Sequence, residues 1–320
     1  MFEETNDASL SKGPCFPIGV QKSDYTRYRM SPPSMSPLRG VPETLHSAEL
    51  ALQRADVRAA EVAWTLLHDE AVDGPLAALK KHAAVEGDEV ERLLLWHAAQ
   101  QAIRRLPSLP VDKAVRERLG QELRQIHTMK VSMTVGSYHF NRAAKMATLR
   151  RFPAGPMEWE ISGIPRSYFL QAAFPANLRL LAFVMFRVRG RAPCFFMHVA
   201  PAPRNRGLSV PKEVLRSYYR MARSLELQPE MLALVAYAWF HDPAAVRDYP
   251  HLEVLNQPYL NHGGLITLLG PAPLLSGVGE GNAQRSADYL AGKVQYRYGF
   301  AIWPRDAAIR WANAHPELGE

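Results

Sequence analysis

Residues 204–209 (RNRGLS) join an apolar segment to an amphipathic one, and they combine basic side chains with a glycine. The N-terminus of a helix presents free backbone N–H groups and a partial positive charge, so it attracts phosphate groups. Gly207 would let the backbone approach phosphate oxygens, and Arg204 and Arg206 would add charge-assisted hydrogen bonds. Ser209 is expected to cap the helix that follows. The segment predicts either a phosphate site or a helix-capping turn with exposed arginines.

A tyrosine and two histidines farther along the chain could move protons. Tyr259 carries a phenol, which can protonate a nearby anion. His241 and Asp242 follow an apolar segment, where strand ends open onto clefts, and histidine titrates near neutrality. His198 lies in an earlier apolar segment, and alternation along a strand could aim it at a substrate. For each histidine the alternative is a hydrogen-bonded structural imidazole, and for Tyr259 it is a packing aromatic.

Metal and cysteine chemistry are not expected. Four candidate ligands fall within one segment without a recognised metal-ligand spacing: His241, Asp242, His251 and His262. Cys15 and Cys194 are the only cysteines, so neither a disulfide framework nor a cysteine zinc site can form. Cys194 lies inside an apolar run, where a nucleophilic thiolate is disfavoured.

The periodicity of apolar residues divides the chain into three parts. Residues 1–40 contain proline, glycine and serine without a sustained period, which predicts an irregular or disordered arm. Residues 41–152 show a helical period, and they predict a layer of helices at about 44–66, 88–106 and 112–128. Prolines and a glycine then mark a boundary. Residues 153–320 are expected to form an α/β domain whose sheet begins after Pro156.

Apolar runs beyond that boundary predict strands. Residues 178–188 (LRLLAFVMFRV) and 194–199 (CFFMHV) flank a turn at Gly190, and together they predict a buried antiparallel hairpin. A helix is expected to begin at Pro211, because proline suits the first helical position. Later segments predict strands at 231–239, 265–269 and 294–303, a short helix at about 252–260, and a C-terminal helix.

Charge and composition limit the function without selecting one. The formal net charge of +7 favours polyanions, whether nucleic acid, an anionic membrane surface or a phosphorylated cofactor. Residues 130–151 interleave aromatic and basic side chains, which is typical of single-stranded nucleic-acid binding or of a solvated helix face. No run of about twenty apolar residues is present, so no membrane span is expected. A cytoplasmic location is the corresponding expectation.

The order of elements over about residues 178–269 resembles the acyl-CoA-dependent N-acyltransferase (GNAT) superfamily. In that superfamily a loop of pattern Arg/Gln-x-x-Gly-x-Gly/Ala holds the pyrophosphate of acyl-CoA. Residues 204–209 are similar to this loop, with Ser209 in place of the final Gly or Ala. Residues 259–263 (YLNHG) are similar to a Tyr-x-x-x-Gly motif of the family, whose tyrosine protonates the departing thiolate.

The resemblance implies an α/β (α+β) fold, in which a helical N-terminal layer precedes a GNAT-like mixed sheet flanked by helices. It implies transfer of an acyl group from acyl-CoA, acetyl or longer, to an amine or peptide, without a metal. Tyr259 would be the acid and His241 or His198 the base, while residues 204–209 would hold the cofactor. The alternative is a non-catalytic protein that binds nucleic acid or a protein partner through its basic surface. Of these partners, nucleic acid is the less favoured.

Overall fold

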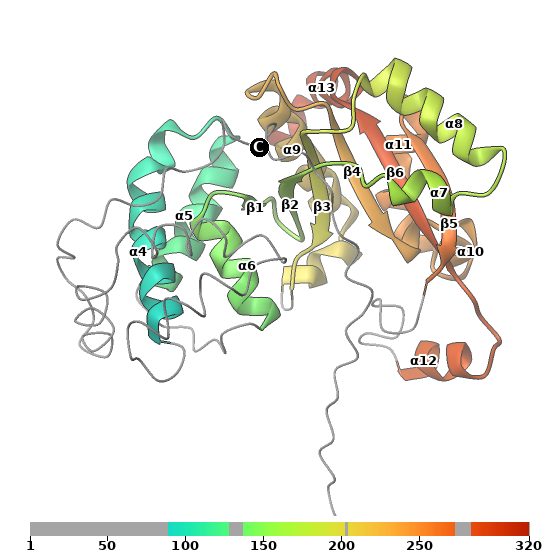
Figure 1. The fold of residues 1–320 in the computed structure, drawn as a ribbon, viewed down its shortest axis with the longest axis horizontal. Coiled ribbons are helices and arrows are strands. Elements are labelled where there is room, and N and C mark those ends of the chain that lie inside the picture. The colour runs from blue at the N-terminus through green and yellow to red at the C-terminus, as the bar shows by residue number, and fades with distance from the viewer. Residues whose placement is uncertain (1–88, 128–136, 202–203, 273–282, 320) are drawn as a thin grey trace, which may run out of the picture.

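The computed structural model describes residues 89–127, 137–201, 204–272 and 283–319. Within them, six strands form one mixed sheet with helices on both faces (Figure 1), which confirms the predicted α/β class. The strands lie in the order β1-β2-β3-β4-β6-β5. Their bounds are β1 Arg151–Pro153, β2 Met157–Ser162, β3 Cys194–Val199, β4 Ala233–Ala238, β5 Leu265–Pro271 and β6 Arg297–Pro304.

Helices connect and cover these strands. The α-helices are α4 Glu89–Arg105, α5 Lys113–His127, α6 Tyr138–Ala147, α7 Ser167–Gln171, α8 Ala176–Phe183, α9 Pro211–Glu226, α10 Pro243–Asp248, α11 Gln257–Asn261, α12 Ala283–Leu290 and α13 Arg305–Asn313. Shorter helical turns used below are η4 Val184–Val188, η5 Arg204–Ser209, η6 Trp239–His241 and η7 Pro250–Leu255. Within the described ranges, no helix is both long and apolar enough to cross a bilayer.

Strands β3 and β4 pair in parallel, whereas the other neighbouring strands pair antiparallel. A parallel pair needs a crossover connection, and α9 provides it. Alternating side chains on these strands enter two separate cores. Phe195 and Leu234 enter the core that includes α9, α11 and α13, while Cys194 and Val235 enter the core under α8. The central strands are therefore buried on both faces.

The helical layer predicted before the sheet is present in the described part of the chain. Helices α4 and α5 confirm the predictions for residues 88–106 and 112–128, and their apolar sides join the core of α9. Helices α4, α5 and α6 lie together at the β1 end of the sheet (Figure 1). The predicted arm at 1–40 and helix at 44–66 lie outside the described residues. Strand β1 ends at Pro153, so the sheet begins earlier than Pro156.

The predicted hairpin of residues 178–188 and 194–199 is wrong in its first half. The second run forms β3, whose antiparallel partner is β2, but the first run forms α8 and the π-helical turn η4. Leu180, Val184 and Val188 face the core at helical spacing. A short apolar run cannot be assigned to helix or strand by its periodicity when apolar residues occupy both sides of the helix. The turn at Gly190 is present, directly after Arg189 in the left-handed region.

The predictions for the remaining elements agree with the structure except at one cap. Helix α9 begins at Pro211 as expected, but its N-cap is Val210, which makes no side-chain cap bond. The hydroxyl of Ser209 instead donates to the carbonyl of Arg206 at 2.8 Å, so Ser209 closes the preceding turn. Strands β4, β5 and β6, the short helices η7 and α11, and the terminal α13 lie where the sequence predicts them.

The two sides of α8 give a direct test of its helical assignment. We expect Leu180→Ala to lower the free energy of unfolding by about 2–5 kcal/mol, because Leu180 is fully buried. Leu181→Ala should change it by less than about 0.5 kcal/mol, because Leu181 is 46% exposed. Denaturant unfolding measures both values. Equal losses would contradict the helix and favour a strand buried on both faces.

Candidate active site

Tyr259 lies in the core, with its hydroxyl facing sulfur. Its side chain is fully buried on α11, and its hydroxyl donates to Sδ of Met197 on β3 at 3.3 Å. The ring of Tyr218 on α9 meets the Tyr259 ring edge to face, with 5.8 Å between centroids. Burial raises the pKa of Tyr259 well above 10, and Tyr218 adds to the rise. The phenol is therefore protonated at neutral pH, so it could give up a proton but not take one.

His241 lies beside Tyr259, with 5.8 Å between the two ring centroids. Its Nδ1 lies 2.5 Å from Oδ1 of Asn256, whose Nδ2 donates to the carbonyl of Phe240 at 3.2 Å. The amide oxygen thus accepts, which places the imidazole proton on Nδ1 and leaves a lone pair on Nε2. That Nε2 is buried without a hydrogen-bond partner. Burial lowers the pKa of His241 to about 4, against the opposing hydrogen bond to Asn256.

Asp242, the other candidate beside this histidine, accepts backbone hydrogen bonds with both of its carboxylate oxygens. Oδ1 accepts from the N–H of Ala244 at 3.0 Å as the N-cap of α10, and Oδ2 accepts from the N–H of Arg297 at 2.7 Å. The carboxylate therefore has a structural role, and Tyr259 and His241 are the two predicted catalytic residues that the structure brings together.

Strands β3 and β4 separate close to this pair, because Met197 on β3 accepts from Tyr259 and His241 follows β4 in η6. The parallel ladder between β3 and β4 ends at Met197 and Ala236. Beyond it, β3 remains paired with β2 as far as Val199, and β4 remains paired with β6 as far as Ala238. The two strands therefore diverge at their C-terminal ends, where the Tyr259 hydroxyl meets Met197. Sequence reasoning missed Met197 and Asn256, because only tertiary packing brings them to the pair.

Residues 204–209 form the 3-10 turn η5 between β3 and α9. The turn contacts both α9 and η7, and η7 leads into α11. Arg206 and Ser209 are exposed, whereas Gly207 packs so closely on Pro156 that an added Cβ would lie 3.1 Å from its side chain. Gly207 thus has a packing role in addition to any role toward phosphate.

His198 lies on the opposite face of β3 from Met197 and does not meet Tyr259. Its Nε2 is 3.5 Å from Oε2 of Glu160 on β2, at the edge of a network of buried charges. Burial alone would raise the pKa of Glu160, but His198 and Lys145 outweigh burial and hold it well below its usual range. His198 is therefore placed with a structural ion cluster and away from the Tyr259–His241 pair.

The same network includes two arginines of the basic segment 130–151, Arg142 and Arg151. Fully buried Glu158 accepts from Nε of Arg142 at 2.9 and 3.0 Å and from Nε of Arg151 at 2.8 Å. Lys145 pairs with Glu160 at 3.0 Å. Arg142 and Arg151 are buried, so they form neither a solvated helix face nor a surface for nucleic acid. They attach α6 and β1 to β2.

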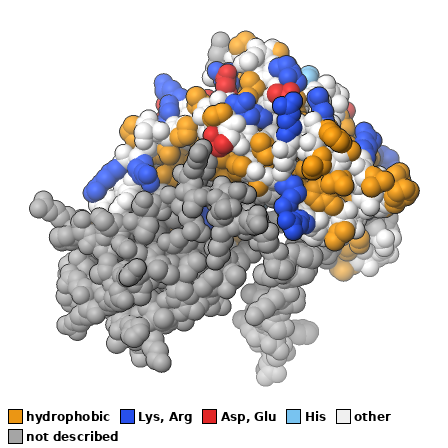
Figure 2. Space-filling model, turned by 45° about the horizontal axis from the view of Figure 1, so that its top comes forward, with side chains coloured by type: hydrophobic (Ala, Val, Ile, Leu, Met, Phe, Trp, Pro, Cys, Tyr) orange, Lys and Arg blue, Asp and Glu red, His pale blue; other side chains and the backbone are white. Residues whose placement is uncertain are grey.

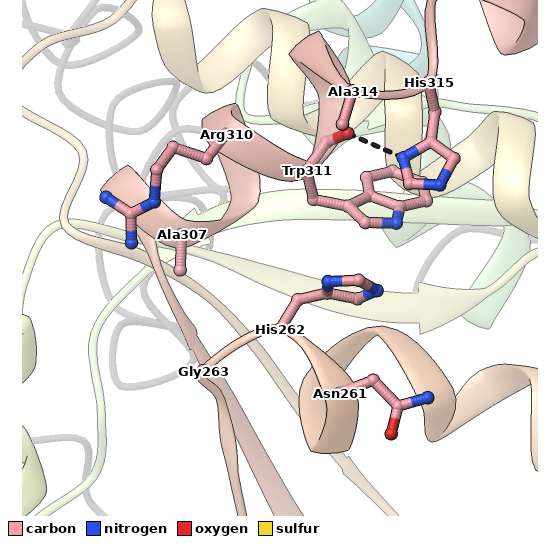
Figure 3. A pocket seen from close by; sticks show the side chains of 8 residues that line it. All are labelled: Asn261, His262, Gly263, Ala307, Arg310, Trp311, Ala314 and His315. Atoms are coloured by element: carbon pink, nitrogen blue, oxygen red, sulfur yellow. Dashed lines mark hydrogen bonds between the residues drawn. The ribbon is translucent and has the colours of Figure 1, made fainter.

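A surface groove of about 330 Å³ lies between the end of α11 and α13 (Figure 3). The His262 ring lies below Trp311 and His315, and Nδ1 of His315 is 2.8 Å from the carbonyl of Trp311. Burial and the charge of His315 lower the pKa of His262. None of the predicted catalytic or cofactor-binding residues lines this groove. Among the described residues, no three potential metal-ligating side chains gather into a metal site.

Similarity to known proteins is remote and does not identify a family for this chain. No protein-family model matches the sequence, and no curated protein matches it. One solved structure with some likeness is an acyltransferase in complex with decanoyl-CoA, which is 14% identical and superposes with a TM-score of 0.45. The alignment covers 87% of this chain and 92% of that one. Likeness at this level identifies neither fold nor function.

The burial of His241 predicts how stability depends on pH. Its pKa is about 4 in the folded chain against 6.5 for the ordinary side chain, so between these values the unfolded chain binds more protons. The neutral, buried His241 therefore contributes its full share to the free energy of unfolding above pH 6.5. This share, about 3 kcal/mol, is lost as the pH falls from 6.5 to 4. His241→Gln should remove this part of the pH dependence of unfolding.

Exposed His139 provides the matched control. Denaturant unfolding between pH 7 and pH 4 should give His139→Gln the wild-type slope and His241→Gln a shallower one. Identical slopes for all three proteins would show that His241 does not resist protonation.

Proposed function

We propose that this chain is an acyl-CoA-dependent N-acyltransferase with a GNAT-like α/β domain, and that its acceptor is an amine. The observation that carries the proposal is the Tyr259 hydroxyl, which donates to a sulfur atom where β3 and β4 diverge. The thioether of Met197 occupies a position where a phenol can hydrogen-bond sulfur. Transfer from a thioester needs a proton donor at the departing sulfur, and this geometry supplies one.

Acyl-CoA would bind across the diverging strand ends. Its extended arm carries amide groups, which can pair with strand edges that have lost their neighbour in the ladder. Its phosphates would lie at η5, where Arg206 is exposed and the N-terminus of α9 follows. Because Tyr259 is fully buried, the thioester reaches its hydroxyl only if the Met197 side chain moves aside. Methionine is flexible enough for such a movement.

The reaction is assigned as follows. The nitrogen of a free amine attacks the thioester carbonyl, and the carbon–sulfur bond breaks as the sulfur takes the Tyr259 proton. The nitrogen of the tetrahedral intermediate is positively charged and far more acidic than an ordinary ammonium. His241 is neutral and can accept that proton at Nε2, although a pKa of about 4 makes it a weak base. His198 has no part in this assignment.

Replacing the phenol tests the assigned acid. Tyr259→Phe keeps the ring and removes the proton donor, so turnover should fall by about 10² to 10⁴-fold while acyl-CoA affinity changes little. The measurement is release of free CoA thiol with a panel of acyl-CoAs and amines. Tyr138→Phe on α6, where the tyrosine is 53% exposed, is the control and should keep full activity. Undiminished turnover of Tyr259→Phe on a confirmed substrate would refute the assignment.

Ligand-induced stabilisation tests the cofactor loop. Acyl-CoA at about 100 times its dissociation constant should stabilise the chain by roughly 2.7 kcal/mol and raise the melting temperature by several degrees. Arg204→Ala combined with Arg206→Ala should abolish most of this shift. Arg104→Ala combined with Arg105→Ala, which removes two exposed charges from α4, should leave it intact. An unchanged shift in the first variant would separate this loop from the cofactor.

A further inference from the structure

An unusual apolar surface covers the outer side of α7, α8 and η4. Six large apolar side chains there are exposed, and we call them the apolar ridge: Leu170, Phe174, Leu178, Leu181, Met185 and Phe186. Leu170, Phe174 and Phe186 are 87%, 77% and 79% exposed, far more than scattered surface residues need to be. Figure 2 shows hydrophobic side chains gathered at the edge of the molecule where Figure 1 places α8.

The ridge contributes nothing to the core beneath it. Leu180, Val184 and Val188 form the inner side of the same helical segment, and they fill the core under α8. A surface helix of this kind normally carries polar residues on its outer side. Here the outer side is apolar as well, so the fold gives no reason for these residues. Contiguous apolar surface of this kind marks an interaction site.

The charged side chains close to the ridge in the sequence are all positive. The sequence contains no Asp or Glu from residue 161 to residue 212. Four arginines in this stretch have exposed side chains near the ridge residues in the sequence: Arg166, Arg179, Arg187 and Arg189. Asp306 of α13 lies near Arg187, but it is already paired with Arg310 at 2.8 Å. The surface therefore combines exposed Phe, Leu and Met with excess positive charge.

We propose that the apolar ridge docks on an anionic membrane surface. An amphipathic segment with arginines beside Leu and Phe suits the lipid interface, where apolar side chains enter the acyl boundary and cations meet anionic headgroups. A second copy of this chain fits less well, because a symmetric contact would bring the arginines of both copies together. The proposal is independent of acyl transfer, since it uses only the outer surface of α7, α8 and η4.

The test is flotation of the full chain with vesicles of phosphatidylcholine, with or without an equal part of phosphatidylglycerol. Wild type should float with the anionic vesicles and stay free of the neutral ones, and added salt should weaken binding. Leu178→Ser with Leu181→Ser and Phe186→Ser should lower the partition coefficient at least about tenfold. Arg179→Glu with Arg189→Glu should lower it more than about twentyfold, since each cation near the surface contributes about fivefold.

Matched controls change equally exposed residues elsewhere. Leu227→Ser with Leu290→Ser and, separately, Arg104→Glu with Arg105→Glu should bind as wild type does. Thermal unfolding of each variant confirms that it is folded. Absence of binding to anionic vesicles, or equal binding by the ridge variants, would overturn the proposal. So would a concentration-dependent dimer that the ridge changes abolish without any vesicle binding, because that result assigns the ridge to a contact between copies.

Discussion

The parallel pairing of β3 with β4 is the constraint on which the rest of this structure depends. It lies in the middle of the sheet, so both strands bury both faces, and it requires a crossover that places α9 on one face. Helices α7 and α8 cover the other face in the described part of the chain. Because each strand also keeps an antiparallel partner, the two can diverge at their ends without leaving the sheet. The divergence creates the setting for Tyr259.

Near the divergence of β3 and β4, two ionisable side chains, Tyr259 and His241, are fully buried, where a charge would be costly. His241 is held neutral, with its Nδ1 proton bound by Asn256, and Tyr259 keeps its proton. An uncompensated charge here would be far more expensive than a neutral imidazole or phenol. Nε2 of His241 is one of the buried polar atoms without a hydrogen-bond partner in the described part of the chain. Unsatisfied polar atoms in a core are rare and call for an explanation, and this one lies beside the proposed acid.

Charged side chains have different roles in two regions of the structure. At the β1 and β2 end of the sheet, Glu158 is buried between Arg142 and Arg151, and replacing it would take from both buried arginines the carboxylate that they share. This network orients α6 against the sheet and uses arginines that would otherwise attract polyanions. Over α7 and α8 the arginines are exposed and have no acidic neighbours in sequence. Buried arginines thus hold elements together at the β1 and β2 end, whereas the arginines over α7 and α8 face solvent.

The sequence by itself determined the local elements. Helical periods predict α4, α5 and α9, proline marks the start of α9, and apolar runs predict β3, β4, β5 and β6. These features follow from propensity and spacing, which act over a few residues. The sequence also offered Tyr259 and His241 as candidates, Tyr259 through the resemblance of residues 259–263 to a family motif and His241 through its place after an apolar run.

Only tertiary structure decided which residues meet. Residues 178–188 became a helix because a short apolar run suits a helix as well as a strand, and packing of one side against the sheet selects between them. His198 fell to the opposite face from Tyr259 because strand register decides which face a residue occupies, and a shift of one residue reverses it. Met197 and Asn256 joined Tyr259 and His241 through contacts between separate elements, which no local pattern encodes.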